Sequence, residues 1–511
     1  MPLKYRIHPA IGIARVGDSP DDYFIGPEAP GISPTLKKPD DQSAQPGTYK
    51  DGQQRIKRQG ARFRIYEYTE DAAGVVTKVR EITLAEAQIE WEVHLANRKA
   101  AAPRLQGAGP RNAGVPERKL IIDAGLHKIG GPNQPMKKLQ GKFMETIDVQ
   151  LGDLLTDNAG RLIILGGHGQ SQSLPQNKLE DFADNDGWCD DVADGPVRAT
   201  IQLNGSAAPV AADSAWVIVA PPDFAPPIEN VITLYDRVYD MMAKFNPALA
   251  VGAKTKVSFT KDIYPIFRRV SNLHWVSDVA ASHHGEGMPD HFISDVKELA
   301  SKDNVRAGPI LRALRNPKDG GGHMPKVPGK SVPPGAALTE VQYKRMERWA
   351  KGRFDADWTG AEPAPVPFDK LAEKDKPQAL DRAALEACVG GPFFPGIEVS
   401  RLVLEKSTYD EKRPFRINNA KLSPGALTEG MAVPWQADFR DCGAEGAADW
   451  WPSQRPIQVR RGHQRDAEWM PEDWKDYIDM VHGWSQLGFV VAKMAGDKVE
   501  YVEDERSADL A

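Results

Sequence analysis

The chain has 511 residues, of which 41% are hydrophobic and 27% are charged, and its formal net charge is −6. That length is about three times the ~150 residues usual for one domain, so two or three domains are expected. The near balance of 65 basic and 71 acidic residues argues against a nucleic-acid or membrane-surface partner, and no apolar run approaches the ~18 residues of a membrane span.

Strand signals dominate the N-terminal part of the chain. Short β-branched and aromatic runs bounded by Gly, Pro, Asn and Asp predict strands over 62–68, 161–167, 198–203 and 215–220. The runs RLIILGG over 161–167 and AWVIVA over 215–220 are mostly apolar and end in turn residues, which predicts more fully buried strands. Stretches rich in Pro, Gly and Gln predict long surface loops over 30–54, 102–117 and 128–140.

Helical periodicity begins at about residue 229. Apolar residues near i, i+3 and i+7 predict a helix over 230–242, and Thr260 is a candidate cap for a helix through residues 263–270. Thr339 precedes a third helix, which Gly352 is suited to end. We therefore expect an α+β fold with a strand-rich N-terminal domain (1–228), a mainly helical middle region (229–378) and a mixed, loop-rich C-terminal region (379–511).

Two polar groupings are candidate ligand sites. His283, His284 and His291 lie close together, but adjacent histidines cannot both face one ligand position and no HExxH occurs, so a polar loop and no metal are expected. The acidic run Asp190, Asp191 and Asp194 could attract a cation, but solvated turn carboxylates are the expectation.

A third grouping joins the three residue types Asp, Cys and Trp. Asp438 stands four residues before Cys442, and Trp450 and Trp451 follow across a linker made almost entirely of Gly and Ala. Such a linker permits a sharp reversal, which would let the sulfur touch an indole ring. On spacing alone, a buried cysteine and two core tryptophans are the expectation, because Cys and Trp are commonly buried.

The same residues carry a resemblance to a known family. The chain resembles the amine and amino-acid oxidases typified by L-lysine ε-oxidase and glycine oxidase, whose cofactor is cysteine tryptophylquinone. The shared motifs run in order along nearly the whole chain: IHPAIGIARVGDS, WEVHLANRKAA, GRLIILGGHG, AWVIVAPPDFAP, PGIEV, MAVPWQADF-x-x-C and WWPSQRP.

The resemblance implies a specific cofactor and specific partners. Cys442 would form a thioether to an oxidised Trp450 or Trp451, a choice the motif leaves open, and this places the quinone in region 379–511. Asp438 would serve as the base and help to make the cofactor. The family also implies O₂ or another electron acceptor, a flavoprotein that installs the quinone, and a homo-oligomer. Because no secretory signal is recognisable, assembly in the cytoplasm is expected, with export by another route left open.

Two positions depart from the pattern of the lysine- and glycine-oxidising members. Phe394, just before the PGIE motif, stands where those members carry Cys or His, and Cys189, next to Trp188, stands where they carry Tyr or Phe. These substitutions predict a more apolar substrate pocket, so neither lysine nor glycine is assumed as substrate.

Three functions follow as hypotheses. The first is a quinoprotein that oxidises a primary amine or amino acid and releases ammonia and H₂O₂. The second is a tryptophylquinone dehydrogenase of a flat, cyclic substrate, and the third is an unprocessed family fold with a binding or structural role.

Overall fold

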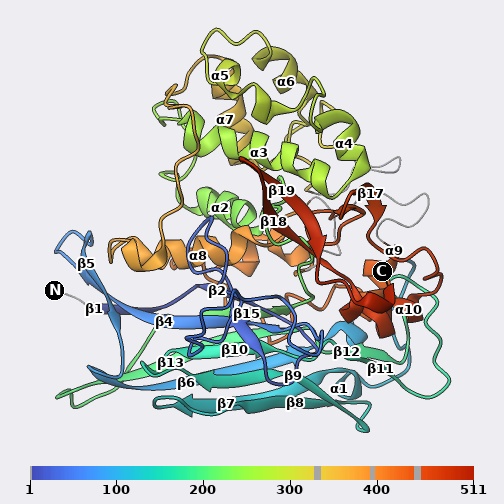
Figure 1. The fold of residues 1–511 in the computed structure, drawn as a ribbon. Helices are drawn as coiled ribbons and strands as arrows, with labels where there is room; N and C mark the ends of the chain where they lie inside the picture. Colours follow the sequence, from blue (N-terminus) through green and yellow to red (C-terminus); the bar gives the residue numbers. More distant parts are fainter. Residues whose placement is uncertain (1–2, 327–334, 392–397, 442–450, 511) are drawn as a thin grey trace.

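The computed structural model describes residues 3–326, 335–391, 398–441 and 451–510. Strands are the main regular elements of the chain up to Ala220, whereas helices and loops dominate the rest (Figure 1). The predicted α+β class, strand-rich first and mixed afterwards, is confirmed.

The elements are as follows. The strands are β1 (Leu3–His8), β2 (Ile11–Arg15), β3 (Tyr23–Ile25), β4 (Arg58–Glu70), β5 (Val76–Ile82), β6 (Ala87–Asn97), β7 (Ile122–Gly130), β8 (Lys137–Phe143), β9 (Ile147–Thr156), β10 (Leu162–Gly166), β11 (Ser171–Ser173), β12 (Trp188–Asp190), β13 (Ala193–Leu203), β14 (Val210–Ala211), β15 (Ala215–Ala220), β16 (Gln458–Arg461), β17 (Gln464–Glu468), β18 (Phe489–Ala495) and β19 (Lys498–Asp504). The α-helices are α1 (Glu117–Leu120), α2 (Leu234–Phe245), α3 (Tyr264–Asn272), α4 (Asp278–His284), α5 (Val296–Leu299), α6 (Ala307–Ala313), α7 (Glu340–Ala350), α8 (Lys376–Glu386), α9 (Trp435–Asp441) and α10 (Tyr477–Gly483).

One large sheet organises the N-terminal part. Its strands run in the order β7-β6-β13-β15-β2-β4-β10-β9-β8, and most neighbours are antiparallel, although β15 and β2 are parallel. The two end strands approach each other closely: a Cβ added to Gly141 on β8 would lie 2.8 Å from the backbone nitrogen of Asp123 on β7. The sheet therefore curls almost into a barrel.

The central strands are buried on both faces, as their unbroken apolar runs predict. On β15, Trp216 and Ile218 face helices α2 and α8, whereas Val217 and Val219 face the interior of the curled sheet. Because side chains alternate along a strand, one apolar run can supply two cores at once. Figure 1 shows α2 and α8 lying along the sheet, with the remaining helices of the middle region beyond them.

The predicted helices form with small corrections at their ends. The helix expected over 230–242 is α2, which begins at Leu234 because Thr233 and Asp236 make a capping box. Thr339 caps α7 in the same way. Thr260 is not a cap: Ser258 accepts the backbone N–H of Lys261, and a π-turn over Phe259–Ile263 leads into α3.

The loop predictions are partly wrong. Residues 128–140 are not one surface loop, since they contain the end of β7 and the start of β8. The polar and apolar residues of β8 alternate, with Leu139, Gly141 and Phe143 buried, and the neighbouring Pro and Gly residues obscured this pattern. The division into regions 1–228, 229–378 and 379–511 stays a prediction.

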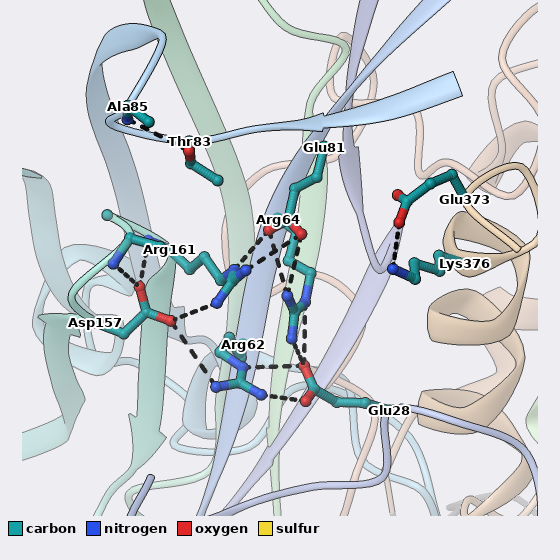
Figure 2. Close-up of polar contacts among 12 residues, drawn as sticks. Glu28, Arg62, Arg64, Glu81, Thr83, Ala85, Asp157, Arg161, Glu373 and Lys376 are labelled. Atoms are coloured by element: carbon teal, nitrogen blue, oxygen red, sulfur yellow. Dashed lines mark hydrogen bonds and ion pairs between the residues drawn. The ribbon is translucent and has the colours of Figure 1, made fainter. Parts of the chain in front are cut away.

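Ion pairs hold the loop after β3 against the sheet. Arg62 and Arg64 project from the same face of β4, and both donate to the carboxylate of Glu28 (Figure 2). Arg64 also donates to Glu81. Arg161, in the turn just before β10, donates to the same carboxylate. Burial alone would raise the pKa of Glu28, but Arg64 and Arg62 outweigh burial and lower that pKa below 4.5.

Glu28→Gln is expected to lower the free energy of unfolding by about 1–3 kcal/mol at pH 7, because the guanidinium groups of the buried Arg64 and the half-buried Arg62 lose their shared carboxylate. The lowered pKa means that the ion pairs stabilise the fold above the unfolded pKa of 4.5. The difference between variant and parent should therefore shrink as pH falls below 4.5.

Urea unfolding across this pH range measures the effect. Asp148→Asn is the matched control, since its partner Lys142 is 58% exposed and the loss of that pair should hardly change the unfolding midpoint. An equal effect from both variants would show that the Glu28 pairs have no special role.

Candidate functional site

A buried ion pair fixes the start of helix α9. Lys99 and Asp190 are completely buried, and the Lys99 Nζ lies 2.5 Å from Asp190 Oδ2. The same carboxylate oxygen accepts the backbone N–H of Trp435, the first residue of α9, at 3.0 Å. Asn97 donates to the other oxygen of Asp190. The end of β6 and strand β12 thus hold α9 against the sheet.

The acidic run at β12 is not solvated, contrary to the sequence expectation. Asp190, Asp191 and Asp194 are 0%, 1% and 0% exposed. Asp194 accepts hydrogen bonds from the indole of Trp216 and from the backbone and side chain of Thr428. Burial raises the pKa of Asp194 to about 6 and that of Asp191 to about 7. These carboxylates organise the interior where the sheet meets the C-terminal region.

Asp438 lies one turn into α9, three residues after Trp435, and is 8% exposed. Burial raises the pKa of its carboxyl well above 3.8, and the nearby Asp441 adds to this effect. Lys99 and Arg455 oppose it, because each positive charge favours the ionised form. Asp438 is therefore a buried acid, and the two buried cations Lys99 and Arg455 limit how far its pKa rises.

Arg455 joins the Trp451 turn to α9. The carbonyl of Trp451 accepts the backbone N–H groups of Gln454 and Arg455, both at 2.9 Å. The Arg455 guanidinium in turn donates to the carbonyl of Phe439, at 2.7 Å. Trp451 itself is 3% exposed. The segment that carries Trp451 is consequently bound to the helix that carries Asp438.

Aromatic side chains enclose this junction. The ring of Trp435 makes edge contacts with Phe439 and Trp484, at centroid distances of 4.9 and 5.4 Å. These three rings belong to the same contiguous apolar cluster as Trp451 and Cys189. Such a cluster excludes water from the surroundings of Asp438, which is consistent with its raised pKa.

Cys189 and Trp188, two of the predicted substrate-pocket residues, differ in their surroundings. Cys189 is 1% exposed within the shared cluster, and burial raises the pKa of its thiol well above 9.0, so it is a neutral, unreactive group. Trp188 is also buried, but its indole donates to the carbonyl of Lys178 outside that cluster. Phe394, Cys442 and Trp450 lie outside the described residues.

The sequence does not mark two polar residues of the site, Lys99 and Arg455, as functional. Lys99 and Arg455 stand within the motifs WEVHLANRKAA and WWPSQRP that carry the family resemblance. Their chemistry could not be recognised there, because a lysine or arginine in a polar motif is normally exposed. Only the fold shows that they face buried acids or backbone carbonyls.

Neither a metal cluster nor a membrane-spanning helix is found in the described ranges. His283 and His284 end helix α4 rather than lying in a loop, and no three His, Cys, Asp or Glu side chains among the described residues are grouped to hold a metal ion. No helix of the described chain is long and apolar enough to cross a membrane.

Two family models match two separate parts of the chain. Residues 8–219 match the model described as L-lysine epsilon oxidase N-terminal, and residues 321–469 match the model of the L-lysine epsilon oxidase C-terminal domain. Together the two matches cover more than two thirds of the chain. A curated relative, the L-lysine 6-oxidase of Marinomonas mediterranea, is 29% identical over an alignment that covers 86% of this chain and 71% of the relative.

Solved structures show the same fold. The structure of the epsilon-lysine oxidase from Marinomonas mediterranea superposes with a TM-score of 0.79 at 22% identity, and covers 99% of this chain and 95% of that one. A second structure, described as the Schiff base intermediate of that L-Lys epsilon-oxidase with L-Lys, superposes with a TM-score of 0.78 at 23% identity, over 98% and 95% of the two chains.

Lys99→Met is expected to destabilise the fold by about 3–5 kcal/mol, because it leaves the Asp190 carboxylate buried without its cation. Urea unfolding measures the loss, and hydrogen exchange should show a less protected Trp435 amide. Lys178→Met is the control, since Lys178 is 79% exposed in its pair with Glu180. Unchanged stability and exchange in Lys99→Met would contradict the positioning role of this pair.

Asp438→Asn is expected to be more stable than the parent at neutral pH. A folded-state pKa above the unfolded value of 3.8 means that the parent loses stability as pH rises from 3.8 through the raised pKa. The amide carries no charge and escapes that loss. Unfolding free energies measured from pH 4 to 8 should therefore diverge in favour of the variant; parallel curves would contradict a strongly perturbed Asp438.

Proposed function

Because the chain belongs to the L-lysine ε-oxidase family, we propose that it oxidises a primary amine or amino acid at a cysteine tryptophylquinone formed from Cys442 and either Trp450 or Trp451. The family membership makes the chain an oxidoreductase. The quinone, the release of ammonia and H₂O₂, and the roles of individual residues are parts of the proposal.

The observation that carries the proposal is the binding of two chain segments to one another around a buried acid. Cys442 directly follows Asp441, the last residue of α9. The turn that begins at Trp451 is tied to the same helix by the bond from Arg455 to the Phe439 carbonyl. The residues present therefore fit a cofactor that joins a cysteine after α9 to a tryptophan of this turn.

The quinone would supply an electrophilic carbonyl and a two-electron acceptor, which ordinary side chains do not provide. We assign the role of the base to Asp438: its carboxylate would accept the proton from the substrate carbon that bears the nitrogen. A base in such a site works best when its pKa approaches the working pH, and burial moves the pKa of Asp438 in that direction. Lys99 and Arg455 keep the ionised form accessible.

The enclosing residues define the substrate environment. Trp435 and Phe439 exclude water from the surroundings of Asp438. The substrate is then the main group nearby that can give a proton to the Asp438 carboxylate. Cys189 adds an apolar, uncharged surface to the same cluster. With Phe394 as a proposed further apolar group, we propose a substrate whose reacting amine is attached to an apolar or uncharged chain. We propose that Trp188, whose indole donates to the carbonyl of Lys178, supports Cys189 from the neighbouring position of β12.

To test this proposal, the full chain is produced together with the flavoprotein that is expected to install the quinone. Peroxide release is then measured over a panel of primary amines and amino acids. Peroxide release with amines is expected, with apolar chains favoured over lysine and glycine. Asp438→Ala should lose the visible quinone absorbance and the activity, because the base also takes part in making the cofactor.

Cysteine variants provide the matched controls. Cys442→Ser should abolish absorbance and activity, whereas Cys189→Ser and Cys388→Ser should keep the absorbance, since both thiols are buried and unreactive. Reduction of a dye by a cyclic non-amine substrate, without peroxide from any amine, would instead support the dehydrogenase function. A fully active Asp438→Ala would remove Asp438 from the mechanism.

A further inference from the structure

A cavity of about 350 Å³ lies where all three predicted regions of the chain meet. The loop after β3, the Pro221–Pro227 segment, helices α3 and α8, and the β18–β19 hairpin all contribute to its wall. Figure 1 shows this long hairpin running between the sheet and the helices of the middle region. A volume of this size is suited to a small organic molecule.

Among the described residues of the cavity wall, every acid except Asp223 forms an ion pair, and Lys57 donates to the carbonyl of Leu36, at 3.1 Å. Glu229 binds Arg268 and Arg269, each at 2.7 Å, and Glu386 binds Arg269. Glu362 binds Arg268 at 2.9 Å. The cavity therefore has a largely neutralised wall, and its remaining acid is Asp223.

Asp223 has no ion-pair partner within the described residues. One of its carboxylate oxygens accepts the backbone N–H of Ala225, at 3.0 Å. Burial raises the pKa of Asp223 to about 7, although the nearby Arg15 lowers it. The guanidinium of Arg15 is itself bound to Glu398, at 2.9 Å. A carboxylate in such a place is stabilised by a cation that enters the cavity.

The wall beside Asp223 is aromatic and apolar. The rings of Tyr49 and Phe489 stack at a centroid distance of 4.5 Å, and both line the cavity together with Tyr501 and Ile56. Aromatic faces attract organic cations, and apolar walls accept an alkyl chain. A carboxylate next to this surface favours an alkylammonium over a bare metal ion or an anion.

This cavity is connected to the proposed quinone site through one residue. Phe224 follows Asp223 in the chain, and its backbone N–H donates to the carbonyl of Gln454 at 2.9 Å. The ring of Phe224 makes an edge contact with the ring of Phe439, at a centroid distance of 6.3 Å. Gln454 in turn donates to the Trp451 carbonyl. A ligand held at Asp223 would therefore lie next to the segments that carry the reaction.

We propose that this cavity is a binding site for primary alkylammonium compounds, with Asp223 as the counterion of the ammonium group and the Tyr49–Phe489 surface as the support for the alkyl chain. Neither Asp438 nor Trp451 is among the residues that line it. Its existence does not require the quinone, but its role as a place where amine substrate is held before oxidation rests on the proposed function.

The test titrates n-butylammonium into the full-length chain by calorimetry, using both matured protein and the Cys442→Ser chain, in which the thioether cannot form. Saturable binding to both is expected, and Asp223→Asn should weaken it at least tenfold. Glu362→Gln is the matched control, because Glu362 lines the same cavity but is paired with Arg268; it should leave binding unchanged.

The pH dependence of butylammonium binding to the parent chain is a second test of the proposal. Butylammonium stays charged at neutral pH, so its binding should strengthen as pH rises through about 7, where Asp223 ionises. Asp223→Asn should remove this dependence. Butyrate should not bind, and K⁺ should not compete at concentrations equal to those of butylammonium.

The results separate this proposal from the proposed function. Asp223-dependent binding to a chain that never shows quinone absorbance would uphold the cavity and reject the oxidase. Quinone absorbance and peroxide release together with unchanged binding in folded Asp223→Asn would reject the cavity alone. Equal competition by K⁺ would identify an inorganic cation site and overturn the alkylammonium assignment.

Discussion

The buried pair between Lys99 and Asp190 is the constraint on which the rest of the site depends. A charge removed from water is costly unless it is paired and hydrogen-bonded, and here one carboxylate accepts a lysine, an asparagine and the first backbone N–H of α9. Any movement of α9 would leave part of that carboxylate unsatisfied. The position of Asp438, one turn further along the helix, follows from this arrangement.

The surroundings of Asp438 balance two opposing effects. Burial and Asp441 favour the protonated carboxyl, whereas Lys99 and Arg455 favour the ionised one. A base that is to accept a proton from carbon needs both: enough proton affinity to take the proton, and enough positive charge nearby to be ionised beforehand. Arg455 serves the geometry as well, since its bond to the Phe439 carbonyl also fixes the turn at Trp451.

Local patterns predicted much of the fold. The apolar run of 215–220 is β15, and the Thr339 capping signal is found at the start of α7. Patterns failed where the deciding interaction is distant in sequence. Asp190 was expected to be solvated, because nothing near it in the chain indicates that Lys99 and Trp435 enclose it. For the site, the family motifs indicate Asp438 and Trp451, but no local signal could show that Asp223 lines a cavity and has no ion-pair partner in the part of the chain that the structure describes.

Intact-mass measurement of the full chain, produced together with its maturing flavoprotein and followed by peptide mapping, tests the central claim most directly. We expect two added oxygen atoms, a net loss of hydrogen and, after cleavage of the chain at Glu445, a Cys442 peptide that stays joined to the peptide containing Trp450 and Trp451. Fragmentation then identifies the modified indole. An unmodified mass with separate Cys442 and tryptophan peptides would contradict the account.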